Sequence, residues 1–153
     1  MRITELMDKD LIIAELYSKT KKDVLKELVD CITKKELEID GNDLLRVLLE
    51  REELGSTGIG DGIAIPHGKV KKIENLMVSF GRSLGGVDFQ SMDGKPTHII
   101  FLLIAPENSA GIHLKALARL SRLLKDSRFR KNIMEADSSQ EIYDLIAQED
   151  EKY

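Results

Sequence analysis

The sequence predicts a single α/β domain over residues 1–153, in which a mixed sheet of roughly five strands lies between helices on both faces. Three observations support this fold class. Short apolar runs of strand type are mixed along the chain with longer segments whose apolar residues recur at helical spacing. One run, "HIIFLLIA" (His98–Ala105), is almost wholly apolar, which is typical of a central strand covered on both faces. A chain of 153 residues can also bury a core without disulfides or a structural metal.

The first half of the chain predicts one strand and two helices. The short run Asp10–Leu16 is apolar and contains β-branched residues, so we expect a strand there. Thr20 and Asp23 resemble a capping box, with Asp in place of the usual Glu, and apolar residues at helical spacing follow them. The break "IDGND" precedes a second helix, which contains Leu44 and ends at Gly55, a typical C-terminal stop.

The second half predicts the remaining strands and then a run of helices. Besides His98–Ala105, the expected strands are the very short Ile63–Pro66, the longer Leu76–Leu84 and the short edge segment Gly85–Phe89. The expected helices are the amphipathic Ile112–Lys125, the segment Arg128–Ala136, and a last helix through Ala147 that Ser138 and Glu141 cap as a box.

Composition excludes several classes of function. The chain has 27 acidic and 23 basic residues and a formal net charge of −4, which argues against a nucleic-acid surface. Its single cysteine, Cys31, permits no intramolecular disulfide. The longest apolar run, Ile99–Ala105, is too short to cross a bilayer, and the N-terminal segment lacks the pattern of a signal peptide. We therefore expect a cytoplasmic protein that is not embedded in a membrane.

The most unusual stretch of the sequence is "GSTGIGDGIAIPHGK" (Gly55–Lys69). Glycines in such a loop often serve only the geometry of turns. Their spacing also suggests a loop that cradles a nucleotide phosphate, but such loops open into a helix. Here Pro66 and Gly68 prevent a helix from starting at once, and no Gly-Lys-Ser/Thr is present. We therefore reject a nucleotide site and interpret the stretch as a loop that presents a histidine.

That histidine is His67. Ile63, Ile65 and His67 alternate along the chain, so an extended backbone points all three to one face. The two isoleucines should be buried, which places the imidazole at the edge of the core. The hydroxyls of Ser56 and Thr57, with accessible backbone N–H groups of the glycines Gly58 and Gly68, would suit an anion held on the imidazole. A phosphoryl group on a ring nitrogen is such an anion.

A metal site is the other class of explanation for the histidines. The chain has three, and they are far apart in the sequence, without a helical pair or a Cys or acidic partner at ligand spacing. We therefore expect no metal and no cofactor.

At this point the chain resembles the IIA proteins of the bacterial phosphoenolpyruvate-dependent phosphotransferase system, specifically the fructose, mannitol and nitrogen-regulatory type. The resemblance covers nearly the whole sequence and implies a mannitol-IIA-like fold. Three segments carry it: "LLEREELGSTGIGDGIAIPHGK" (Leu48–Lys69), "IIFLLIAPENSAGIHLKALARLSRLLKD" (Ile99–Asp126) and "FRKNIMEADSSQEIYDLI" (Phe129–Ile146).

The resemblance implies a mechanism and partners. The histidine of the family's signature, His67 by its motif, would accept a phosphoryl group from HPr or a nitrogen-type HPr paralogue. It would pass the group to a IIB component, or hold it as a signal to regulatory target proteins. Neutral imidazole is a fair nucleophile near pH 7, and neither a nucleotide nor a metal is needed.

Two further residues match the family's site. Arg51 in "EREEL" matches the active-site arginine, whose guanidinium can hold two phosphoryl oxygens. Without the resemblance, Arg51 would be interpreted as an exposed helix charge paired with Glu50, Glu52 or a neighbour. His113 in "GIHLKAL" matches the second histidine and would stabilise the phosphoryl group. Without the resemblance it would be a solvated histidine at a helix start.

Three residues near these are interpreted as structural. His98 matches no motif and begins a buried strand, and Lys69 is interpreted as a solvated lysine. Asp61, between Gly60 and Gly62, is expected to form an Asp-Gly turn, although a carboxylate aimed at the site would repel a phosphoryl group.

The sequence leaves two roles open for a phosphocarrier of this kind. In one, the chain is a nitrogen-regulatory protein whose phosphorylation state selects its binding partners, and the stand-alone length favours this role. In the other, it is the fructose- or mannitol-specific IIA component that serves a separate IIB chain. A binding module that is never phosphorylated is a third reading, and the combination of His67, Arg51 and His113 argues against it.

Overall fold

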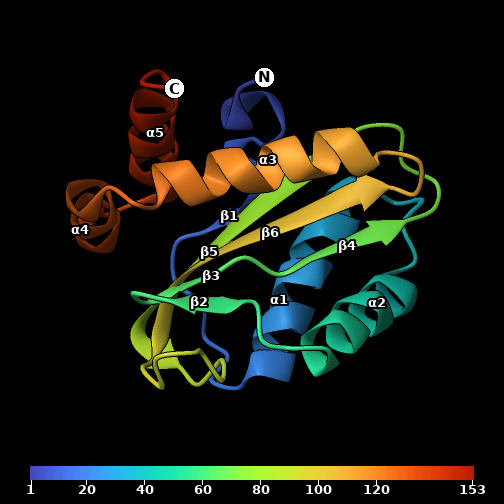
Figure 1. Ribbon diagram of the computed structural model, residues 1–153, viewed down its shortest axis with the longest axis horizontal. Coiled ribbons are helices and arrows are strands. Elements are labelled where there is room, and N and C mark those ends of the chain that lie inside the picture. The colour runs from blue at the N-terminus through green and yellow to red at the C-terminus, as the bar shows by residue number, and fades with distance from the viewer.

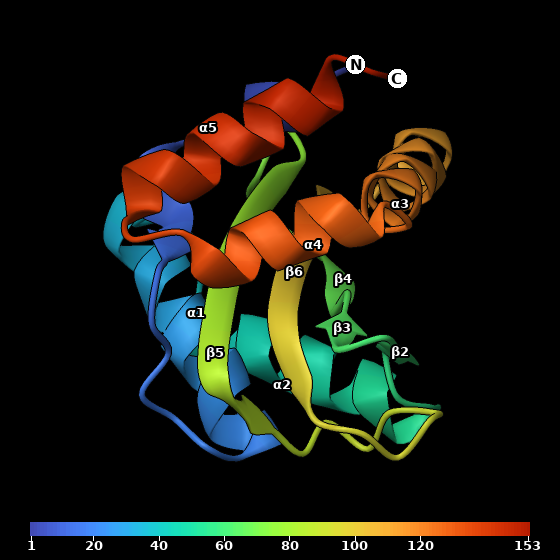
Figure 2. The same ribbon diagram turned by 90° about the vertical axis from the view of Figure 1, so that its left-hand side faces the viewer.

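A six-stranded sheet lies between two layers of helices in the computed structural model, which describes residues 1–153 (Figure 1). Two helices cover one face of the sheet and three lie over the other, as the turned view shows (Figure 2). This arrangement confirms the predicted α/β class. The helices are α1 (Lys21–Lys35) and α2 (Gly41–Glu53) on the first face, and α3 (Ala110–Leu123), α4 (Ser127–Glu135) and α5 (Ser139–Asp150) on the second, with the 3₁₀ helices η1 (Ile3–Glu5) and η2 (Lys9–Leu11) near the N-terminus.

The sheet is mixed, as expected. Its strands are β1 (Ile12–Ile13), β2 (Gly58–Gly60), β3 (Ile63–Ala64), β4 (His67–Val70), β5 (Met77–Val87) and β6 (Thr97–Pro106). Their order is β1-β5-β6-β3-β2, and β4 pairs with β6 beyond the end of β3. Strand β5 is antiparallel to β6, whereas β3 and β4 are parallel to it. Because β4 pairs with β6 alone, its other edge is open.

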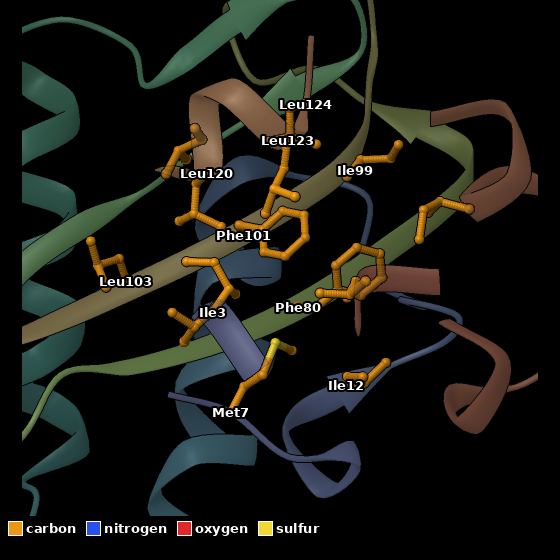
Figure 3. Close-up of a cluster of buried hydrophobic side chains, with 14 of the residues drawn as sticks. Ile3, Met7, Ile12, Phe80, Ile99, Phe101, Leu103, Leu120, Leu123 and Leu124 are labelled. Carbon is orange, nitrogen blue, oxygen red and sulfur yellow. The ribbon is translucent and has the colours of Figure 1, made fainter. Parts of the chain in front are cut away.

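Strand β6 is the central strand that the apolar run predicted, and it is buried on both faces. Its residues alternate between two hydrophobic clusters, so Phe101 and Leu103 face α3 whereas Leu102 and Ile104 face α1 and α2. On the α3 side, Phe101 packs edge-on against Phe80 of β5, with ring centroids 5.0 Å apart (Figure 3). The core therefore fixes which side chains of the neighbouring strands point to each helical layer.

The helix starts show the N-cap half of each predicted capping box, whereas the Glu141 carboxylate accepts from the Asp137 N–H instead of the Ser138 N–H. Thr20 Oγ1 accepts a hydrogen bond from the Asp23 backbone N–H at 3.2 Å, at the start of α1. Ser138 Oγ likewise accepts from the Glu141 N–H at 3.1 Å, at the start of α5. In each case a side-chain oxygen satisfies an N–H that has no partner inside the helix.

Two expectations about the strands are corrected, and two strands were missed. The run Asp10–Leu16 contributes only the two residues of β1, because the Asp8 side chain accepts from the Asp10 N–H and begins η2 there. The segment Gly85–Phe89 is no separate strand, since β5 continues through an irregularity to Val87 opposite Thr97. The strands β2 and β4 were not predicted, as their sequences "GIG" and "HGKV" have little strand propensity.

Candidate functional site

His67 is the first residue of β4, and its side chain points to the α3 face of the sheet. Ile63 and Ile65 are both buried in the cluster beneath α3, as their alternation with His67 predicted. His67 lies opposite Leu103 in the parallel ladder, and Leu103 belongs to the same cluster. The imidazole is half-buried at the end of that row, on a strand whose outer edge is open.

The backbone fixes the tautomer of the His67 ring. Nδ1 lies 2.8 Å from the carbonyl oxygen of Ile65. A carbonyl oxygen only accepts hydrogen bonds, so Nδ1 must carry the hydrogen. In the neutral ring, Nε2 then keeps a free lone pair. The ring nitrogen that is available as a nucleophile is therefore Nε2, which the sequence alone did not reveal.

His113 lies in the first turn of α3 and meets the His67 ring. The two ring centroids are 5.5 Å apart and the rings are nearly perpendicular, at 74°. The His113 side chain is buried, and its Nε2 has no hydrogen-bond partner in the protein. Burial lowers the pKa of His113 from its ordinary value, and the nearby charges of His67 and Lys69 lower it further. His113 is therefore a neutral imidazole at pH 7 with an unused polar atom beside His67.

The start of α3 adds a feature that sequence reasoning missed. No acidic residue lies in its first turn, and the Ser109 side chain makes no capping hydrogen bond to the helix. Ala110, Gly111 and Ile112 are exposed, so the positive end of the helix dipole lies open next to His113. The absence of an acidic residue from "SAGIHLK" is the sequence signal that could have indicated this open helix end.

Arg51 lies in the last turn of α2, on the other side of β4. One turn earlier, Val47 packs so closely beneath Gly68 that a Cβ on the glycine would lie 2.8 Å from Val47 Cγ1. The Arg51 guanidinium donates to the Gly55 carbonyl oxygen at 2.8 Å and forms no ion pair. The alternative reading of Arg51 as half of a salt bridge is therefore wrong.

The neighbours of Arg51 form their ion pairs elsewhere. Glu50 pairs with Arg46, and Glu52 pairs with Lys21. No hydrogen bond joins Arg51 to His67, but α2 and β4 hold the two residues on adjoining elements.

The residues of the predicted phosphate cradle have other hydrogen-bond partners in this structure. Ser56 Oγ donates to the Phe89 carbonyl oxygen at 2.6 Å, and the Gly58 N–H donates to Ser56 Oγ at 3.0 Å. The Thr57 hydroxyl donates to Glu52 and is buried with it. These three residues therefore hold the loop together through their own hydrogen bonds, and a phosphate-cradling role for them and for Gly68 stays a prediction.

Glu52 is a buried residue of the site region that the sequence reasoning did not single out. Its carboxylate accepts from the Thr57 N–H at 3.0 Å, from the Thr57 hydroxyl, and from Lys21 Nζ at 2.9 Å. The available signal was its spacing, because Glu52 follows Leu44 and Leu48 on the buried stripe of α2.

Three further residues near the site lie as their structural interpretation expects. Asp61 has a φ of 56° and Gly62 a φ of 77°, so both adopt the left-handed conformation of a tight turn between β2 and β3. His98 Nδ1 lies 2.9 Å from the Ser83 carbonyl oxygen, to which it donates. The Lys69 side chain is exposed.

One hollow of the protein, with a volume of about 820 Å³, is lined by residues of α1 and of the segment around β1, including Tyr17 and Cys31. Because β1 and β4 lie on opposite sides of the β5–β6 pair, this hollow is remote from His67.

No group of three or more His, Cys, Asp or Glu side chains is placed to hold a metal ion. None of the helices has the length and apolar character required to cross a membrane.

Comparison with protein families matches residues 5–149 to the family described as "Phosphoenolpyruvate-dependent sugar phosphotransferase system, EIIA 2". Among characterised relatives, the fructose-specific EIIABC component of Bacillus subtilis is 43% identical over 98% of this chain, which spans only 24% of that protein. A nitrogen regulatory protein of Bradyrhizobium diazoefficiens is 42% identical over 96% of this chain and 95% of its own length.

Solved structures give the same result. The nitrogen regulatory protein IIA-Ntr of Neisseria meningitidis superposes with a TM-score of 0.87 at 32% identity, over 94% of this chain and 98% of that one. The mannitol IIA protein of Escherichia coli has a TM-score of 0.76 at 22% identity, over 91% of this chain and 97% of that one, which shows a shared fold.

Proposed function

This chain belongs to the EIIA 2 family of the phosphoenolpyruvate-dependent phosphotransferase system, and on that premise we propose that it carries a phosphoryl group on Nε2 of His67. The observation that carries the proposal is the state of the ring. Its Nδ1–H is held by the Ile65 carbonyl, so the Nε2 lone pair is free, and a second imidazole with an unpaired Nε2 lies beside it.

The donor under this proposal is a histidine-phosphorylated protein of the HPr type, or a nitrogen-type paralogue. Nε2 of His67 attacks the phosphorus in line with the donor's P–N bond. The new Nε2–P bond forms while the donor's P–N bond breaks, and the bonding electron pair returns to the donor's ring. The Ile65 carbonyl stabilises the positive charge that the His67 ring acquires, because its oxygen already accepts from Nδ1–H.

The groups around His67 are suited to the charge on the transferring phosphoryl group. A neutral His113 that carries its hydrogen on Nε2 donates to a phosphoryl oxygen without needing a change of protonation. The open N-terminus of α3 favours negative charge at the same place. Arg51 has no carboxylate to release first, so its guanidinium is free to turn toward a phosphoryl oxygen. Transfer of this kind needs alignment and charge stabilisation more than covalent help from the protein.

We assign the chain to the nitrogen-regulatory type, in which the phosphorylated and free forms bind different target proteins. The Neisseria meningitidis IIA-Ntr structure and the Bradyrhizobium diazoefficiens regulator support this assignment. A fructose-specific IIA role is the second candidate, because the Bacillus subtilis relative is equally similar within this region. Either role places the protein in the cytoplasm with its donor.

Two experiments test the proposal. The protein is incubated with enzyme I, an HPr-type donor and phosphoenolpyruvate, and its intact mass is measured. We expect the wild-type protein to gain one phosphoryl group and His67→Ala to gain none, whereas a wild-type protein that stays unmodified would refute the carrier role. Rapid transfer from the phosphorylated protein to a fructose-type IIB domain would refute the regulatory assignment and support the sugar-specific one.

A further inference from the structure

A continuous series of hydrogen bonds joins the buried carboxylate of Glu52 to the ring of His67. Glu52 accepts from both the backbone N–H and the hydroxyl of Thr57. The carbonyl oxygen of Thr57 accepts from the Ile65 N–H at 3.0 Å. The carbonyl oxygen of Ile65 in turn accepts from Nδ1 of His67 at 2.8 Å. Each residue of the series thus sets the position of the next one.

The Glu52 end of this series is firmly held. Lys21, the first residue of α1, reaches Glu52 with Nζ at 2.9 Å, and its side chain is only 13% exposed. The same Nζ lies 3.3 Å from the side-chain oxygen of Gln90 and 4.8 Å from the centroid of the Phe89 ring. The carboxylate therefore has three donors on its two oxygens, which are the partners that a buried charge needs.

The series links the carboxylate to the Ile65 segment on one side, and the Leu103 N–H, which donates to the Pro66 carbonyl at 3.0 Å, holds the next residue on the other. Ile65 lies between β3 and β4 and belongs to neither strand. Its backbone N–H donates to the Thr57 carbonyl. If Thr57 shifts, the Ile65 peptide groups lose this restraint, and the hydrogen bond that keeps the hydrogen on Nδ1 weakens. A neutral imidazole that loses such a partner divides its hydrogen between the two nitrogens.

We infer that Glu52, charge-compensated by Lys21, is a positioning residue that acts through Thr57 and Ile65 to hold His67 in the tautomer with a free Nε2. The effect of the tautomer on phosphoryl transfer rests on the proposed function, but the tautomer itself is a property of the unmodified protein. Glu52 touches neither the donor nor the phosphoryl group in this scheme.

The first test measures the ring directly. Nitrogen NMR of histidine-labelled protein reports which ring nitrogen of neutral His67 carries the hydrogen, and it needs no donor protein. Glu52→Met removes every acceptor while keeping the side-chain length. We expect it to raise the population with the hydrogen on Nε2, and Glu52→Gln, which keeps one oxygen acceptor, to lie between it and the wild-type protein.

A matched control comes from another buried glutamate. Glu27 of α1 is 9% exposed, as Glu52 is, and it too accepts from two backbone N–H groups, those of Tyr17 and Ser18. Glu27→Met removes a similar set of acceptors without touching the series that leads to His67. We expect wild-type ring signals in this variant. Wild-type signals in Glu52→Met, or an equal change in Glu27→Met, would overturn the inference.

Thr57 provides a test that does not depend on how well Glu52→Met folds. Thr57→Val keeps the shape of the side chain and removes only the hydroxyl that Glu52 accepts from, whereas Thr57→Ser keeps the hydroxyl. We expect Thr57→Val to change the His67 signals in the same direction as Glu52→Met. We expect Thr57→Ser to give the wild-type signals. Equal signals in the two Thr57 variants would count against the series.

The second test is the rate at which the donor phosphorylates each variant. A misplaced nucleophile costs of the order of tenfold or more in rate, so we expect that loss in Glu52→Met and a change of less than about twofold in Glu27→Met. A wild-type protein that is never phosphorylated would refute the proposed function and leave the NMR result standing. A phosphorylated wild-type protein with an equally fast Glu52→Met variant would refute the inference alone.

Discussion

Gly68, the residue after His67, allows α2 to approach β4, and replacing it with alanine tests that packing. A Cβ at this position would lie 2.8 Å from Val47 Cγ1 and 3.6 Å from Leu48 Cδ2. Carbon atoms pack at about 3.5–4.0 Å, so Val47 must retreat by roughly 0.7 Å or more. Gly68 does not have a positive φ, so the substitution adds crowding without backbone strain. Overpacking of this size costs about 1–3 kcal/mol, and we predict that loss in the free energy of unfolding of Gly68→Ala.

Urea denaturation of four proteins checks this prediction: the wild type, Gly68→Ala, Val47→Ala and the double variant. Because Val47→Ala removes the atom that the new Cβ would meet, the Gly68 substitution should cost less than about 0.5 kcal/mol in that background. The reasoning would be refuted by a cost that is the same in both backgrounds, since the crowding would then have another origin. Displacement of α2 should also slow phosphoryl transfer, because α2 carries Arg51.

Three other predictions concern the site and its surroundings. The lowered pKa of His113 means that, below about pH 6.5, the unfolded chain binds a proton more readily than the folded one. The stability of the wild-type protein relative to His113→Gln should therefore be greatest above that pH and should fall as the pH decreases toward the folded pKa. Urea denaturation of both proteins at pH 7 and at pH 5 measures this difference. If His113 were solvated, the difference would not change with pH. Arg51→Ala and His113→Ala should each slow phosphoryl transfer by roughly 10²–10³ while leaving the acceptor in place, and rates within twofold of wild type would contradict their roles. The donor should dock around His67 and the start of α3, where Ile112 and Leu114 are 54% and 67% exposed, so amide shifts induced by HPr that were confined to α5 would exclude this surface.

The sequence predicts the direction of His67 because the rule behind it is local. Ile63, Ile65 and His67 alternate along the chain. The apolar run that was identified as the central strand is β6, with which both β3 and β4 pair. Side-chain alternation on an extended backbone does not depend on the rest of the fold. The helix caps at Thr20 and Ser138 were predictable for the same reason, as each involves residues within one turn.

The features that escaped prediction depend on contacts between distant segments. Strand β4 exists because the residues His67 to Val70 pair with β6, and their own propensity gives no indication of it. The Ser56 and Thr57 hydroxyls look free in the sequence, but Phe89 and Glu52 accept their hydrogen bonds in the fold.

For the burial of Glu52 the sequence offers only its spacing behind Leu44 and Leu48, and it does not show what compensates the charge. Its charge indicates an exposed position at the end of a helix, yet Lys21 arrives from α1 and allows the carboxylate to be buried. Only the folded chain brings these partners together.

The central claim is that Nε2 of His67 is the phosphoryl acceptor, and the bond between phosphorus and nitrogen can be observed directly. The protein, labelled with nitrogen-15 in its histidines, is phosphorylated by the donor system, and phosphorus–nitrogen coupling is measured by NMR. The hydrogen bond from Nδ1 to the Ile65 carbonyl predicts a single coupling, to Nε2 of His67. A phosphorus atom coupled to Nδ1 of His67, or to either nitrogen of His113, would contradict the account.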